Sequence, residues 1–158
     1  MVERTGSRVG VEVLFYHLER QSLEEVLPPL LEKCLERGWR AAVQIPDPER
    51  LEAINQHLWT YRDDAFLPHG TSVDGPAARQ PVYLTTGEDN PNGAAVRFLA
   101  DGAYLADPSG YVRVVHLFDG NDEAALASAR ARWSTAKKAG HAVTYWRQTD
   151  RGRWERKA

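Results

Sequence analysis

The sequence predicts a single α/β domain, a three-layer α/β/α sandwich built on a mixed, mostly parallel sheet. Three observations predict it. The chain has 158 residues, which is long enough for one domain with a sizeable core. Runs rich in β-branched residues alternate with helical repeats of apolar residues over the N-terminal part of the chain, the pattern of parallel βαβ units. The first run, residues 9–17, is almost continuously apolar, as expected for a strand covered on both faces.

The first half of the chain carries two strand–helix pairs. Ser22 and Glu25 have the spacing of a capping box, which predicts the start of the first helix. Asp47 and Pro48 suit the N-cap and the first turn of a second helix. The expected elements are a strand at 9–17, a helix at 22–37, a strand at 40–45 and a helix from 47 to about 59.

The second half is richer in strands and ends with one long helix. Asn121 is expected to be the N-cap of this helix. Lys137 and Lys138 fall in its last turn, where the helix dipole favours positive charge, and Gly140 can end it. The expected elements are strands at 81–85, 95–100, 111–118 and 142–148, the helix at 121–140, and a basic tail at 153–158 that closes a single domain spanning 1–158.

The motifs of the enzymes that use layered α/β folds are not found. No glycine-rich phosphate loop follows the first strand, and there is no GxSxG elbow. The five histidines are scattered, and Cys34 is the single cysteine, so no metal-binding spacing arises. We therefore expect a Rossmann-like topology without a nucleotide site, and a protein with no catalytic residues, no metal and no cofactor.

Charge is distributed unevenly along the chain. Residues 130–158 hold nine Lys or Arg residues against Asp150 and Glu155, a net charge of +7, whereas the whole chain carries −2. Such asymmetry suggests an acidic partner, either nucleic-acid phosphates or an acidic peptide, although basic tails are often only solubilising. No apolar run approaches the ~20 residues that span a bilayer. With no secretory signal at the start, we expect a cytoplasmic protein with no membrane partner.

One side of the 121–140 helix combines an indole with cations. Arg130, Trp133 and Lys137 have the spacing i, i+3, i+7, which places them along one side of a helix, with Lys138 beside them. An aromatic plane between two cations can hold a carboxylate together with an apolar side chain. The alternative is that Trp133 simply faces the core and the arginines are ordinary surface charges.

The segment 59–70 is unusually aromatic for a connection. It places Trp59, Tyr61 and Phe66 close together and ends in Pro68, His69 and a glycine. Aromatic residues are enriched in protein interfaces, so these side chains suggest a recognition surface. The alternative is that they cover an edge of the sheet.

Two sequence blocks carry a resemblance to a known family. They are LWTYRDDAFLPHG at 58–70 and FDGNDEAALASARARWSTAKKAGHAVTYWRQ at 118–148. Together with the Phe-Tyr pair of the first strand and the Gly38-Trp39-Arg40 turn, they resemble the chi subunits of bacterial DNA polymerase III holoenzyme. The resemblance covers nearly the whole chain, and the Leu-Trp…Phe-x-Pro-His pattern is its most specific part.

This resemblance implies a non-catalytic adaptor with a nucleotide-binding-like topology. Chi subunits bind the psi subunit, which ties them to the clamp loader, and in some bacteria a helicase instead. They also bind the acidic, Phe-terminated tail of single-stranded-DNA-binding protein, so DNA is contacted mainly indirectly. By position, the resemblance assigns Trp59, Phe66, Pro68 and His69 to psi or the helicase. It assigns Arg130 and Trp133 to the tail.

Two basic positions of the family's tail site are replaced here by Leu126 and Ser134. Lys137 and Lys138, one turn further along, can substitute, because screened attraction acts over ~8 Å at physiological salt. Direct binding of single-stranded nucleic acid by the basic C-terminus stays open as an alternative, because aromatics interleaved with cations stack bases. A nucleotide-dependent enzyme is disfavoured by the missing glycine-rich loop.

Overall fold

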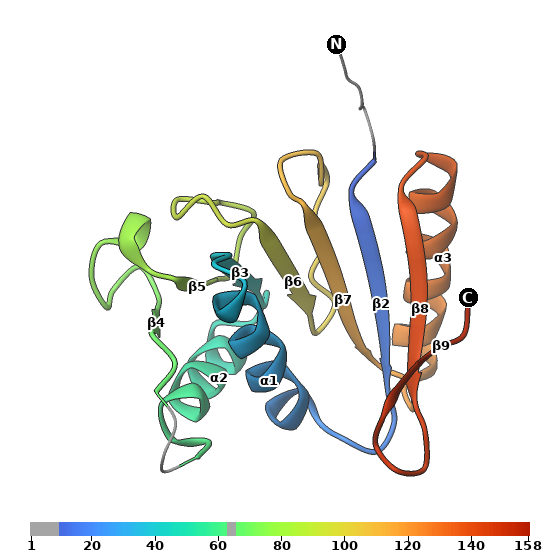
Figure 1. Cartoon of the computed structure of the whole chain (residues 1–158), viewed down its shortest axis with the longest axis horizontal. Helices are drawn as coiled ribbons and strands as arrows, with labels where there is room; N and C mark the ends of the chain where they lie inside the picture. Colours follow the sequence, from blue (N-terminus) through green and yellow to red (C-terminus); the bar gives the residue numbers. More distant parts are fainter. Residues whose placement is uncertain (1–9, 63–65) are drawn as a thin grey trace.

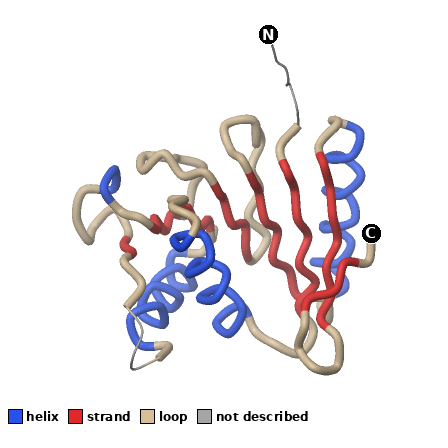
Figure 2. The backbone as a smooth tube through the Cα atoms, in the orientation of Figure 1, coloured by secondary structure: helices blue, strands red, loops and turns tan. Residues whose placement is uncertain are grey.

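The computed structural model describes residues 10–62 and 66–158, which form an eight-stranded sheet with three α-helices (Figures 1 and 2). The strand order is β4-β5-β3-β6-β7-β2-β8-β9, and every pair is parallel except β8 with β9. The predicted mixed, mostly parallel sheet is therefore confirmed. The elements are β2 Glu12–Leu18, α1 Leu23–Glu36, β3 Ala41–Gln44, α2 Pro48–Thr60, β4 His69–Gly70, the 3₁₀ helix η1 Ala77–Arg79, β5 Val82–Thr85, β6 Val96–Ala100, β7 Arg113–Asp119, α3 Glu123–Lys138, β8 Ala142–Gln148 and β9 Trp154–Arg156.

The three layers follow from the alternation of side chains along β2. Leu14 and Leu18 join the buried cluster formed with α1 and α2, whereas Val13 and Phe15 join the cluster formed with α3. Successive residues of a strand point to opposite faces, so an apolar run such as β2 supplies both. Helices α1 and α2 therefore cover one face of the sheet and α3 covers the other (Figure 1).

Helix α1 shows how the sequence sets local structure. The predicted capping box is present: the Ser22 hydroxyl accepts from the Glu25 N–H, and the Glu25 carboxylate accepts from the Ser22 N–H. Pro28 lies inside the helix and cannot donate to the Glu24 carbonyl one turn earlier. His57 of α2 supplies the missing donor, with Nε2 2.7 Å from that oxygen. The proline therefore does not end α1, and the replacement bond ties α1 to α2.

Two expectations about element boundaries were wrong. The N-cap of α3 is Asp122, whose carboxylate accepts from two N–H groups of the first turn, while the Asn121 amide donates to Glu19 O instead. The expected basic tail contains β9, which pairs antiparallel with β8. The segment 71–80, which is not among the elements expected from the sequence, contains η1.

The structure does not describe every residue used in the predictions. Val9, the expected start of the first strand, lies outside the described residues, and β2 begins at Glu12. Asp63 and Asp64 of the aromatic segment also lie outside them.

Candidate interaction sites

The indole of Trp133 lies between the helix and the sheet, and it is half-buried. Its ring meets Phe15 of β2 edge-on, with the centroids 5.7 Å apart, and meets Tyr145 of β8 in the same way at 5.9 Å. Ala129, one turn earlier on α3, is buried in the same cluster. Trp133 is thus anchored by the core but not sealed within it, so the two alternatives drawn from the sequence are both partly right.

Two cations lie on the same side of α3 as this ring. The Lys137 ammonium lies 5.4 Å from the Trp133 ring centroid, within cation–π range. Arg130, one turn before the indole, is exposed, and no hydrogen bond or ion pair within the described residues engages its guanidinium. The spacing expected from the sequence therefore brings Arg130, Trp133 and Lys137 to one side of α3. Lys138 is exposed as well, but it points about 100° further round the helix.

Arg132 of the same helix differs from Arg130, because its guanidinium is bound by the protein's own backbone. Its guanidinium donates to the carbonyl oxygens of Ala103 and Gly102, at 2.7 and 3.2 Å. It also lies over the Tyr104 ring, 5.4 Å from the centroid. Arg132 holds the loop after β6 against α3, whereas Arg130 is available to a ligand.

Tyr145 of β8 adds a second aromatic ring beside Trp133, and the sequence analysis did not predict it. The Tyr145 hydroxyl lies 2.6 Å from His17 Nδ1, which fixes the orientation of the phenol. Burial raises the pKa of Tyr145, and burial together with nearby Arg147 lowers the pKa of His17. Both groups are therefore uncharged at neutral pH. Glu19, the carboxylate next to them, already pairs with Arg147. The cation of Arg130 is thus not offset by a free carboxylate of this group.

A signal for Tyr145 is present in the sequence. Strand alternation in residues 142–148 places Val143, Tyr145 and Arg147 on one face. The alternation alone does not tell which of the two faces α3 covers. That depends on the strand order, in which β8 pairs with β2 and not with β7.

The second candidate site lies at the end of α2. Trp59 is 44% exposed and Phe66 is 76% exposed, and their ring centroids are 6.2 Å apart. The Trp59 ring lies against the buried His69 ring, with the centroids 4.1 Å apart. His69 is itself fixed, since its ring nitrogens lie 2.6 and 3.1 Å from the carbonyl oxygens of Leu67 and Asn55. Pro68 is half-buried.

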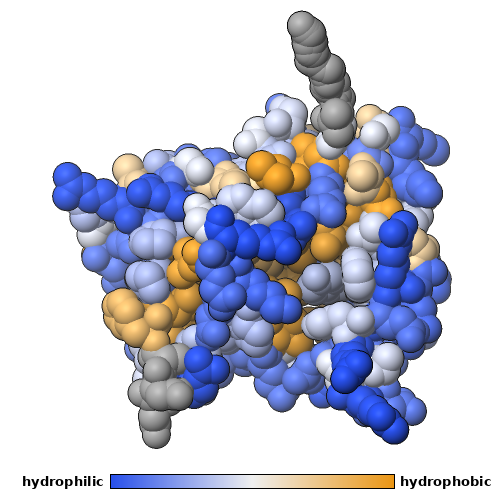
Figure 3. All heavy atoms as spheres, viewed as in Figure 1, coloured by the Kyte–Doolittle hydropathy of each residue, from blue (hydrophilic) through white to orange (hydrophobic). Residues whose placement is uncertain are grey.

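These contacts divide the predicted residues into two roles. Trp59 and Phe66 form an exposed aromatic pair, whereas His69 supports the indole from below and is too buried to contact a partner directly. In Figure 3, hydrophobic atoms reach the surface beside the grey segment that follows α2. Trp59, near the end of α2, and the Arg130–Trp133 face of α3 belong to helices that cover opposite faces of the sheet (Figure 1).

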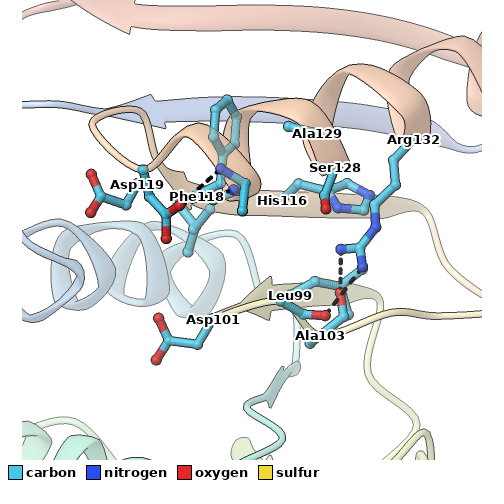
Figure 4. Close-up of a pocket in the computed structure, with 14 residues that line it drawn as sticks. Leu99, Asp101, Ala103, His116, Phe118, Asp119, Ser128, Ala129 and Arg132 are labelled. Atoms are coloured by element: carbon cyan, nitrogen blue, oxygen red, sulfur yellow. Dashed lines mark hydrogen bonds between the residues drawn. The ribbon is translucent and has the colours of Figure 1, made fainter.

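A hollow of about 480 Å³ lies where folds of this topology commonly bind nucleotides, at the carboxyl ends of β6 and β7 (Figure 4). Phosphate binding there uses free N–H groups at a helix N-terminus. Here the Asp122 carboxylate already accepts from the N–H groups of Ala124 and Ala125. Asp119 also lines the hollow and adds negative charge. Of the other charged lining residues, Asp101 pairs with Arg50, and the Arg132 guanidinium already donates to the Ala103 and Gly102 carbonyl oxygens. The chemistry of this hollow therefore opposes nucleotide phosphates.

The hollow also holds a histidine kept neutral by its surroundings. His116 stacks on Phe15 with the ring centroids 4.4 Å apart. Burial lowers its pKa to about 3, and nearby Arg132 acts in the same direction. Within 10–62 and 66–158, no cluster of three or more potential metal ligands is found. In the same residues, no helix is both long and apolar enough to cross a membrane.

Comparisons with known proteins agree with the sequence resemblance. The family model described as "DNA polymerase III chi subunit, HolC" matches residues 11–144. A protein of Rickettsia prowazekii (strain Madrid E), named "Probable DNA polymerase III subunit chi", is 31% identical over 102 residues. That match covers 63% of this chain and 62% of the relative, so it spans less than two thirds of the relative's length. Because the family model spans most of the chain, including β2 to α3, the chain belongs to the DNA polymerase III chi subunit family.

Proposed function

We propose that the chain is a non-catalytic adaptor of the replicative polymerase holoenzyme, acting in the cytoplasm. One face binds the acidic C-terminal tail of single-stranded-DNA-binding protein. The other binds the psi subunit of the clamp loader, or a helicase in its place. The adaptor thereby links the clamp loader to DNA that is already coated, and its contact with DNA is mainly indirect.

The observation that carries the tail site is the guanidinium of Arg130, which is exposed and has no hydrogen-bond or ion-pair partner among the described residues, one helical turn from the half-buried Trp133. A tail that ends in Pro-Phe-carboxylate needs a bidentate donor for its terminus, which arginine supplies. Its ring needs an apolar wall, which the T-shaped pair of Trp133 and Tyr145 offers. Lys137 lies on the same side for a preceding carboxylate, and Lys138 adds to the field at longer range.

The tail site is tested by titration calorimetry with a synthetic acidic peptide ending in Pro-Phe. Arg130→Ala should weaken binding at least about tenfold, the expected loss for a charge-assisted bidentate contact. Arg79→Ala is the matched control, because Arg79 is also exposed but lies in η1, next to β5 near the other edge of the sheet. Equal affinity of the Arg130 variant and the parent refutes the assignment. Equal loss in both variants shows only a net-charge effect and also refutes it.

The aromatic pair supports the second partner site. Trp59 and Phe66 expose adjacent rings on a platform that His69 fixes, the arrangement of an interface hot spot. Phe66→Ala should abolish co-purification with psi or the helicase while leaving tail-peptide affinity unchanged. Val73→Ala is the control, because Val73 is 86% exposed and its substitution removes exposed apolar surface outside the aromatic pair. Unchanged co-purification of the Phe66 variant with both candidate partners contradicts this site.

A further inference from the structure

Part of one sheet face has none of the described helices over it. Helices α1 and α2 cover that face toward β4, whereas the strands from β7 to β9 lie beyond them (Figure 1). A trough of about 240 Å³ lies between α1 and this uncovered part. In Figure 3 the same face is hollowed beside α1, with hydrophobic atoms on the floor and hydrophilic atoms on the rims. Its lining comprises four half-buried aromatic residues, three cations and an apolar floor that includes the buried Phe98: Tyr16, Trp39, Trp146 and Trp154; Lys33, Arg37 and Arg113; and Leu30, Cys34, Val96, Phe98 and Val115.

The aromatic rings of the trough form a continuous group. Tyr16 stacks on Trp154 with the centroids 4.7 Å apart, and it meets Trp146 edge-on at 6.3 Å. Trp154 is held in place because β9 pairs with β8, where it lies opposite Gln148. All three rings are half-buried, so each keeps an accessible part.

The fourth ring, Trp39, carries cations on it. The guanidinium carbons of Arg37 and Arg113 lie 5.0 and 5.3 Å from its centroid. A guanidinium held over an indole presents a flat, positively charged surface, on which a base can stack while a phosphate is bound at its edge.

The charged side chains that line the trough are all cations. None of the described residues that line it is a carboxylate. Arg113 pairs with Glu12 at 2.6 Å, but Lys33 and Arg37 are exposed, and neither makes an ion pair within the described residues. Arg156 lies two residues after Trp154 in β9 and opposite Trp146 of β8, so its side chain is on the same face of the sheet as these two rings and adds a cation there.

We propose that this trough binds single-stranded nucleic acid directly, with bases on the aromatic rings and phosphates on Lys33, Arg37 and Arg113. Several rings interleaved with cations suit successive nucleotides, whereas an acidic peptide that ends in one phenylalanine uses a single ring. The trough lies on the sheet face opposite the tail site, because Tyr16 and Phe15 are consecutive in β2 and point to opposite faces. The inference therefore stands or falls separately from the proposed function.

The test is fluorescence anisotropy of a labelled oligonucleotide of about 12 thymidines, the length of one ordinary single-strand site. Bound bases should also quench tryptophan fluorescence. The logarithm of the association constant should fall with the logarithm of salt concentration with a slope of about −2, for three contacted phosphates. Lys33→Glu and Arg37→Glu should each weaken binding more than about tenfold. Both side chains are exposed, so the fold should survive, which circular dichroism checks.

Arg79→Glu and Arg130→Glu are the matched controls and should bind the oligonucleotide within about twofold of the parent, since screening limits charges more than ~8 Å away. Absence of binding at about 100 µM protein in low salt overturns the proposal, because even non-specific contacts reach that range. Equal loss in the trough and control variants also overturns it. A third outcome also overturns it: the oligonucleotide does not bind, whereas an acidic aromatic peptide binds and loses its affinity in the Arg37 variant.

Discussion

Replacing Trp133 separates its two roles, packing and recognition. Trp133→Ala removes the edge-on contacts with Phe15 and Tyr145, each about 0.5–1.5 kcal/mol beyond area burial. A fully buried tryptophan costs about 3–5 kcal/mol when truncated to alanine. Because Trp133 is only half-buried, we expect a loss of about 2 kcal/mol in the free energy of unfolding, measured by urea denaturation.

The same variant should lose tail-peptide affinity by about tenfold, because the peptide's aromatic ring loses its wall. Trp133→Tyr is the matched control. A tyrosine at this position still reaches Phe15 and Tyr145, so it should retain most of the stability and most of the affinity. Calorimetry and denaturation on the same protein preparations provide both values. A Trp133→Ala variant that keeps the parent's stability and affinity would contradict both roles of the indole. A variant that loses stability alone would show that the indole packs against the core and does not bind the peptide.

Three further variants test the fold. His57→Ala should cost about 1–2 kcal/mol in urea denaturation, because it leaves the Glu24 carbonyl without its donor; an unchanged midpoint would contradict this. Arg97→Met should lower the free energy of unfolding by at least about 3 kcal/mol, because this fully buried side chain donates to Gln44 and to two carbonyl groups, whose oxygens methionine leaves without a donor; an unchanged free energy would contradict this. His116→Phe should flatten the acid side of the stability curve. The pKa of His116 is about 3 in the folded chain, against an ordinary value of 6.5 for an exposed histidine, as in the unfolded chain. Between these two values the unfolded chain binds a proton that the folded chain does not. The free energy of unfolding therefore falls as the pH drops from 6.5 toward 3, by up to about 1.4 kcal/mol per pH unit. An equally steep curve in the variant would contradict that.

The layered fold was predictable because its signals are local. The apolar run of β2 and the Ser22–Glu25 capping box each act within one element, and both occur as expected. Strands β4 and β9 gave no such signal, since they are two and three residues long and exist only by pairing with a neighbour. The N-cap of α3 was misassigned because Asn121 and Asp122 both offer a suitable oxygen, and only backbone geometry decides which one faces the helix.

The candidate sites divide in the same way. Helical spacing alone placed Arg130, Trp133 and Lys137 on one side of α3, and the structure has them there. The degree of burial of Trp133 was not predictable, because it depends on Phe15 and Tyr145 from two distant strands. The trough beside α1 was invisible in the sequence for the same reason, since its rings come from separate strands and loops.

A thermodynamic cycle tests the central claim, that Arg130 receives the carboxylate terminus of an acidic tail. Parent and Arg130→Ala proteins are titrated with the tail peptide and with the same peptide bearing a C-terminal amide. If the guanidinium binds the terminus, the two changes overlap, and their coupling energy should be at least about 1 kcal/mol. Strictly additive effects, with a coupling energy near zero, would contradict the claim.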